Sequence, residues 1–208
     1  MNTTVEIPTP QELQNYLNKA MDFDTYFKQF NDATERVKND DTEGLVYPEY
    51  YVINMQRLKR GVKTTKLSDE LMAPINDLDQ KITWLVITEF WCGDAAQSIG
   101  LLAKVAEAAN GKIDLKFVFR DENPELMDAF LTNGGKSIPK VIQLNDNNEV
   151  ISDWGPRPAP AQEIVVDLLA KKESYNDPLH AWYAKDRGVH MQEEIAELLR
   201  AWSKGHRA

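Results

Sequence analysis

The chain has a single cysteine, Cys92, and its surroundings make it the first residue to consider for chemistry. It lies in the segment 89–95, EFWCGDA, directly after the β-branched and apolar segment 82–88, ITWLVIT. The apolar segment is typical of a buried strand, and the residues after Cys92 have the periodicity of a helix. A sulfur at a helix start faces unpaired amides and the positive end of the helix dipole, which favour the thiolate and lower the thiol pKa. Cys92 is therefore a candidate nucleophile, and the alternative is a buried, unreactive cysteine.

The hydrophobic pattern predicts the elements that must position this cysteine. After the strand 82–88 it predicts a helix to about residue 110, a strand over 113–119 and a helix from Asn123 to 131. Two short strands, 139–144 and 149–153, flank a polar turn and are expected to pair as a hairpin, and Pro160 opens another helix. A strand–helix–strand crossover followed by an antiparallel hairpin and a covering helix indicates an α/β sandwich.

Helical patterns flank this unit on both sides. Four segments precede it: 10–21, which a capping box at Thr9 opens, then 23–37, a helix after Pro48 that stops at Gly61, and a shorter helix or turn over 67–80. Two further helices, 176–185 and 189–202, follow it. We therefore divide the chain into an N-terminal helical extension (1–80), an α/β domain (81–172) and a C-terminal helical extension (173–208), with the extensions packed on the core.

Composition excludes several classes of function. The chain has 24 Lys and Arg against 33 Asp and Glu, a net charge of −9, which opposes binding to nucleic acid or to an anionic membrane. No apolar run has the length of a membrane span and the first residues do not resemble a targeting signal, so we expect a cytoplasmic protein. A single cysteine excludes an intramolecular disulfide. His180, His190 and His206 lack metal-ligand spacing, so we expect neither a metal nor a cofactor.

Two segments together resemble the thioredoxin-like superfamily. Residues 91–95, WCGDA, resemble the Trp-Cys-Gly-x-Cys motif of that superfamily, and Ser137-Ile138-Pro139 resembles the loop that carries its cis proline. The resemblance covers about residues 81–172, and the layout with helices before and after resembles a bacterial thioredoxin-like subgroup. It implies a three-layer sandwich with a four-stranded mixed sheet, in which Pro139 lies against Cys92 and Gly93 follows the sulfur into the helix.

The departures from the superfamily motif restrict the chemistry. The second, resolving cysteine falls on Ala95, so the two-thiol cycle cannot run. A one-thiol cycle remains, in which Cys92 attacks a disulfide or peroxide and an external protein or low-molecular-weight thiol resolves the product. The buried acid of the superfamily is here Val86, which leaves Glu89 as the nearest proton acceptor; the alternative for Glu89 is a solvated acid at the strand end. We interpret Asp94 as a solvated acid that stabilises the helix by about 0.3–1 kcal/mol.

The resemblance also implies where a substrate lies. It places a substrate chain along Ser137 and Ile138, with Trp91 as the opposite wall, and backbone groups of Ile138 are available to an extended peptide. The remaining groove residues come from the loop after the last strand: Trp154, Gly155 and Arg157. Lys136, Lys140 and Arg157 are candidates to favour a thiolate or an acidic ligand, and the alternative for each is a solvated surface charge.

Three functions follow from these residues. The first is a cytoplasmic thiol redox protein that acts through Cys92. The second is a non-catalytic binding module that holds a peptide or protein partner in the same groove. The third is a thiol-dependent peroxidase, which requires an arginine such as Arg157 beside the sulfur.

Overall fold

The computed structural model describes residues 6–205, with side chains described through residue 201. His206, one of the three histidines considered above, lies outside the described residues.

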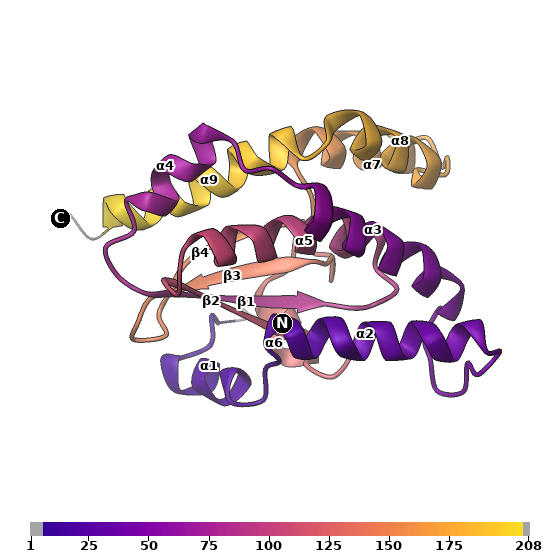
Figure 1. Cartoon of the computed structure of the whole chain (residues 1–208), viewed down its shortest axis with the longest axis horizontal. Coiled ribbons are helices and arrows are strands. Elements are labelled where there is room, and N and C mark those ends of the chain that lie inside the picture. The colour runs from indigo at the N-terminus through magenta and orange to yellow at the C-terminus, as the bar shows by residue number, and fades with distance from the viewer. Residues whose placement is uncertain (1–5, 206–208) are drawn as a thin grey trace, which may run out of the picture.

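A four-stranded mixed sheet forms the centre of the molecule (Figure 1). Its order is β2 (Ile113–Phe119), β1 (Ile82–Thr88), β3 (Lys140–Leu144) and β4 (Val150–Trp154). β1 runs parallel to β2 and antiparallel to β3, and β3 pairs antiparallel with β4 through an irregularity between Gln143 and Leu144. The predicted crossover and hairpin are therefore confirmed, and so is the α/β fold class with a mixed four-stranded sheet.

Helices cover both faces of this sheet (Figure 1). α5 (Gly93–Ala108) follows β1, α6 (Pro124–Ala129) follows β2, and α7 (Ala159–Ala170) follows β4. α5 shares its face with α3 (Tyr51–Thr64), α4 (Asp69–Asn76) and α9 (Val189–Gly205), whereas α6 lies on the opposite side with α1 (Pro10–Leu17) and α2 (Phe23–Lys38). The remaining elements are a 3-10 turn, Pro48–Tyr50, and α8 (Asn176–Asp186). Within the described residues, no helix has both the length and the apolar character needed to cross a membrane.

Two helix ends differ from the sequence-based prediction. The first helix ends at Leu17 rather than near Met21, because Met21 leaves the helix to exchange backbone hydrogen bonds with Phe117 at 2.8 and 2.9 Å. α3 continues through Gly61 to Thr64 because this glycine packs against α5: a Cβ added to Gly100 would lie 2.9 Å from the Gly61 Cα. Here glycine permits the close approach of two helices rather than ending one of them.

The N-terminal helices and α9 share one hydrophobic core with the sheet. Leu13, Phe30 and Met55 of the N-terminal helices and Ile195 of α9 belong to the same buried cluster as Trp84 of β1. The N-terminal extension and α9 thus pack on the core as expected, whereas α8 packs with α7 in a second cluster that includes Leu179 and Val165. The domain boundaries at residues 80 and 172 stay a prediction.

An aromatic cluster fixes the loop that leads to Cys92. Phe90 stacks on Phe30 with ring centroids 4.5 Å apart and meets Tyr51 edge-on at 6.0 Å. The buried Asn54 donates a hydrogen bond to the Phe90 carbonyl oxygen at 3.1 Å. The N-terminal helices therefore hold the strand-to-helix turn on which the cysteine sits.

Candidate functional site

Cys92 is the N-cap residue of α5, between the end of β1 and the first helical turn. Its Sγ accepts a hydrogen bond from the Ala95 amide at 3.4 Å and donates one to the Ile138 carbonyl oxygen at 3.2 Å. The Ile138–Pro139 peptide bond is cis, as the resemblance implies. Only 6% of Cys92 is exposed, so the sulfur lies between the helix start and the segment before Pro139.

Burial dominates the ionisation of this thiol. It raises the pKa of Cys92 to about 12, and the negative charge of Asp94 adds to that shift. The amides of Ala95 and Asp94 lower the pKa, as the position at a helix start suggests, but by less than burial raises it. The prediction that the helix start lowers the pKa of Cys92 below its usual value is therefore wrong for this conformation, and the sulfur is a protonated thiol.

Asp94 is buried, and the interpretation of this residue as a solvated acid is wrong. Only 7% of it is exposed. Its Oδ2 accepts hydrogen bonds from Arg157 Nη2 at 2.6 Å and Nε at 3.0 Å, and its Oδ1 accepts one from the Tyr183 hydroxyl at 2.6 Å. Arg157 is thus engaged by a carboxylate, and Asp94 joins the start of α5 to the loop after β4 and to α8.

A cavity of about 540 Å³ opens beside Cys92. It is lined by residues from α3, from the start of α5, from the segment before Pro139 and from α8. The basic groups among them are Arg57, Arg120, Lys136, Arg157 and His180, against two acids, Asp94 and Asp177. The other lining residues are Tyr50, Ile53, Trp91, Cys92, Gly93, Ser137, Ile138, Tyr175, Asn176 and Leu179. The cavity is therefore a small-molecule-sized hollow with an excess of positive groups.

His180 forms part of this cavity although sequence analysis gave it no role at the cysteine. A Cβ added to Gly93 would lie 3.0 Å from the His180 Cε1, so the imidazole packs directly on the residue after the sulfur. Its Nδ1 is buried and has no hydrogen-bond partner among the described residues. Burial lowers the pKa of His180 and the charge of Arg57 lowers it further, which keeps the ring neutral at neutral pH.

Trp91 forms a wall of the cavity, as the resemblance implies. The Arg120 guanidinium lies 4.7 Å from its ring centroid, and the ring of Tyr47 meets it edge-on at 5.5 Å. The indole Nε1 is buried without a partner in the described part of the chain. Tyr47, Tyr50 and Ile53 are exposed beside this wall, so the rim of the cavity is apolar on the α3 side.

Glu89 lies outside the cavity lining. Its carboxylate accepts a hydrogen bond from the Asp121 amide at 2.9 Å. Burial, followed by repulsion from Asp121, raises the pKa of Glu89 to about 7. The acid therefore titrates near neutral pH, but its side chain faces the turn after β2 rather than the sulfur.

The predicted groove residues divide into two groups. Ser137 and Ile138 line the Cys92 cavity, and Trp154 and Gly155 line a second hollow near α9. Arg157 lines both. Trp154 donates its Nε1 hydrogen to Glu194 at 2.6 Å. A Cβ added to Gly155 would collide with the Pro139 carbonyl oxygen, so Gly155 supports the proline loop from behind.

Two lysines near the groove pair with acids. Lys140 is only 4% exposed and pairs with Asp153 at 2.8 Å, so the alternative of a solvated surface charge is wrong, and it does not line the Cys92 cavity. Lys136 is exposed and pairs with Asp128 at 2.7 Å. Across the described residues, no group of three or more His, Cys, Asp or Glu side chains is arranged to hold a metal ion.

Two solved structures have a fold similar to that of this chain. A crystal structure of a protein of unknown function from Pseudomonas aeruginosa has a TM-score of 0.60 and 15% identity, covering 87% of this chain and 92% of that one. A crystal structure of an HIV epitope-scaffold has a TM-score of 0.63 and 16% identity, and the match covers 95% of this chain and 99% of that one. Both likenesses concern the fold alone. No curated protein matches the chain. A family model described as thioredoxin matches residues 45–175, more than half of the 208 residues. The chain therefore belongs to the thioredoxin family.

Proposed function

We propose that this protein is a thiol redox protein that exchanges disulfides through Cys92 alone. The Cys92 thiolate attacks a disulfide RS–SR′, the sulfur–sulfur bond breaks, R′S⁻ leaves and takes up a proton, and Cys92 is held as a mixed disulfide with R. The thiolate of a second thiol, R″SH, then attacks the mixed disulfide and releases Cys92. In the net reaction R″SH and RSSR′ become R″SSR and R′SH, and the external thiol supplies both electrons.

The observation that carries this proposal is the placement of the sulfur. Cys92 lies at a helix start, accepts the Ala95 amide hydrogen and lines the cavity of about 540 Å³. Ala95 is itself fully buried and takes the place of a resolving thiol, so resolution falls to a thiol that enters the cavity from outside. The cavity provides room for that thiol and for the leaving group.

His180 is the proposed proton acceptor. The Cys92 thiol is protonated at rest, and thiolate is the species that attacks a disulfide. The neutral imidazole packs on Gly93, and its Nδ1 has no partner among the described residues. Transfer of the thiol proton to this ring gives a thiolate–imidazolium pair, the activated form of a cysteine nucleophile beside a base.

The charge of the cavity favours an acidic partner. Arg57 lines the cavity and has no ion pair in the described part of the chain. Arg120 and Lys136 line it too and form surface ion pairs with Asp121 and Asp128, whereas Arg157 is paired with the buried Asp94. A low-molecular-weight thiol or disulfide that carries carboxylates, or an acidic protein segment, fits these cations best. The exchange needs reduced thiols in excess, a condition met in the cytoplasm. The pairing of Arg157 with Asp94 counts against the peroxidase hypothesis, which requires a free arginine at the sulfur.

A non-catalytic binding module is the second candidate. The observation that favours it is the burial of the sulfur, 6% exposed, with a pKa raised to about 12. In this case the cavity and its apolar rim of Tyr47, Tyr50 and Ile53 hold a partner and no bond to sulfur forms.

Mixed-disulfide formation separates the two candidates. The folded protein is incubated with oxidised glutathione, an acidic disulfide, at about pH 7.5, and its intact mass is recorded before and after excess reduced thiol is added. Redox function predicts a single adduct that the thiol removes, slower formation in His180→Asn, and no adduct in Cys92→Ser. A folded wild-type protein that forms no adduct contradicts the redox proposal and leaves the binding module.

A further inference from the structure

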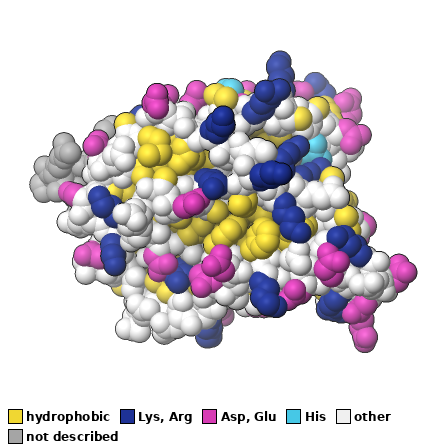
Figure 2. Space-filling view, in the orientation of Figure 1, with side chains coloured by type: hydrophobic (Ala, Val, Ile, Leu, Met, Phe, Trp, Pro, Cys, Tyr) yellow, Lys and Arg dark blue, Asp and Glu magenta, His cyan; other side chains and the backbone are white. Residues whose placement is uncertain are grey.

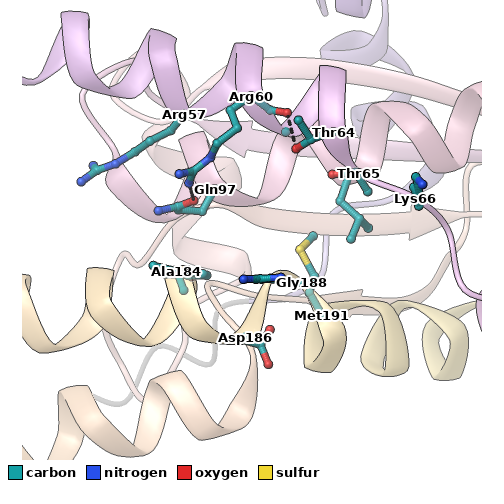
Figure 3. A pocket seen from close by; sticks show the side chains of 14 residues that line it. Arg57, Arg60, Thr64, Thr65, Lys66, Gln97, Ala184, Asp186, Gly188 and Met191 are labelled. Atoms are coloured by element: carbon teal, nitrogen blue, oxygen red, sulfur yellow. Dashed lines mark hydrogen bonds between the residues drawn. The ribbon is translucent and has the colours of Figure 1, made fainter.

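A second cavity, of about 530 Å³, lies between α3, α5 and the corner where α8 meets α9. Figure 3 shows Arg60 of α3 and Gln97 of α5 facing each other on one side, with Ala184, Gly188 and Met191 on the other. We call this space the α3–α8 cavity. The Cys92 mechanism does not use it, although Arg57 lines both cavities.

The base of the α3–α8 cavity is apolar. Leu101 and Met191 line it, and both are buried. Gly188, with a φ of +83°, brings the α8–α9 corner so close that a Cβ added to it would lie 3.5 Å from Leu101 Cδ1. The volume is within the range of cavities that hold small organic molecules.

Four cations surround this apolar base: Arg57, Arg60, Lys66 and Arg187. In the described part of the chain, none of them forms an ion pair, although the protein has 33 acidic residues and 24 Lys and Arg. Among the described residues the side chain of Arg57 donates only to the neutral Asn54, at 2.9 Å. Burial, followed by repulsion from Arg60, lowers the pKa of Arg57. Figure 2 shows Lys and Arg side chains gathered over α3 and beside α8.

The one acid that lines the cavity does not neutralise these cations. Asp186 contacts the His190 ring through its Oδ1, and Figure 3 shows its carboxylate directed away from Arg60 and Gln97. Within the part of the chain that the structure describes, the Arg60 side chain makes a single hydrogen bond, to the Gln97 side-chain oxygen at 3.3 Å. Besides burial, repulsion from Arg60 thus lowers the pKa of Arg57, by more than the charge of Asp94, which is paired with Arg157, raises it.

We propose that the α3–α8 cavity binds a small organic anion, with its carboxylate or phosphate group at Arg57 and Arg60 and its apolar portion against Leu101 and Met191. Guanidinium groups bind either oxyanion through paired hydrogen bonds, and a bound anion removes the repulsion between the two arginines. This site shares Arg57 with the cavity beside Cys92, but no step of the proposal involves the sulfur.

Three probes of equal ring size test the proposal: benzoate, phenyl phosphate and the uncharged benzamide. Each is titrated into the full-length protein at constant ionic strength while backbone amide NMR signals are followed. The proposal predicts saturable shifts of the Thr64, Gln97 and Gly188 amides by at least one anion, with a Kd at or below about 5 mM. Binding of only one anion identifies the preferred charged group. Absence of saturable shifts up to about 20 mM overturns the proposal, as does equally tight binding of benzamide.

Substitutions locate the site. Arg60→Gln removes one cation, and Gln97→Glu places a carboxylate beside Arg60; each is expected to weaken anion binding roughly tenfold. Lys59→Gln is the matched control, because Lys59 is the neighbour of Arg60 but donates to Asn31. Cys92→Ser keeps wild-type affinity, which separates this site from the redox proposal. Equal affinity in wild type and Arg60→Gln overturns the assignment.

Discussion

Replacement of Asp94 by Asn tests whether the buried carboxylate controls both the stability of the site and the ionisation of Cys92. The side chains of Asp94 and Arg157 are 8% and 10% exposed, and the ion pair between them is 2.6 Å long. Removal of one partner leaves a buried guanidinium without a counter-charge, a change that destabilises proteins by about 3–5 kcal/mol. For a chain of this size we expect the melting temperature to fall by about 6–20 °C.

The same substitution changes the reactivity of the sulfur. Asp94 is the second cause of the raised Cys92 pKa, after burial. Its neutralisation lowers that pKa, so more thiolate is present at a given pH and alkylation by iodoacetamide is faster. The assay is the pH dependence of the alkylation rate in wild type and Asp94→Asn, at a temperature where both are folded.

Two controls complete this prediction. Asp167→Asn makes the same chemical change in an exposed ion pair, Lys171–Asp167, and we expect a cost of about 0.5 kcal/mol or less. The double variant D94N/R157Q removes both buried charges and should be more stable than Asp94→Asn alone. The reasoning is refuted if Asp94→Asn costs no more than Asp167→Asn, or if it leaves the alkylation profile unchanged.

Three further predictions follow from the site. Gly155→Ala should destabilise the protein by about 2 kcal/mol or more, because the residue has a φ of +122° and its added Cβ meets the Pro139 carbonyl; urea unfolding measures this, and a change below about 0.5 kcal/mol would contradict it. Glu89 has a pKa raised from 4.5 to about 7, so the folded state binds its proton more tightly than the unfolded chain does. The unfolding free energy of the wild type, taken relative to that of Glu89→Gln, should therefore decrease as the pH rises from 4.5 to about 7. The same pH dependence of unfolding free energy in both proteins would disprove this. Ala95→Cys places a second thiol beside Cys92 and should give a protein that reduces disulfides with a dithiol as electron source; an inactive folded variant would show that the missing thiol is not what limits the site.

Much of the fold is readable from local sequence pattern. The strands 82–88 and 113–119 were predicted with the bounds that the structure has. The first is a nearly continuous β-branched and apolar run, and the second alternates apolar with charged residues before it becomes apolar. Cys92 was placed at a helix start because a helical apolar periodicity follows it directly after the first strand. The end of the first helix was not predictable, because Met21 pairs with Phe117, a strand residue distant in sequence.

The site itself depends on contacts that the sequence does not encode locally. Asp94 follows Cys92 in the helix and has the pattern of a solvated first-turn acid, yet Tyr183 and Arg157 bury it. Arg57 and His180 reach the cavity from α3 and α8, helices whose periodicity shows an apolar face but not what it packs against. The only sequence signal for His180 was its residue type.

The most direct test of redox function is the rate at which Cys92 reacts with oxidised glutathione, compared between the folded protein and the chain unfolded in urea at about pH 7.5. A pKa of about 12 in the folded protein, against about 8.5 for a free cysteine, lowers the thiolate fraction at this pH by about 3 × 10³. The greater nucleophilicity of the more basic thiolate recovers a factor of about 30, so a buried thiol without assistance reacts about a hundredfold more slowly when folded. Assistance by His180 and the cavity cations predicts that the folded protein reacts at least as fast as the unfolded chain. A folded rate that is lower by about a hundredfold would contradict redox function and leave a binding module.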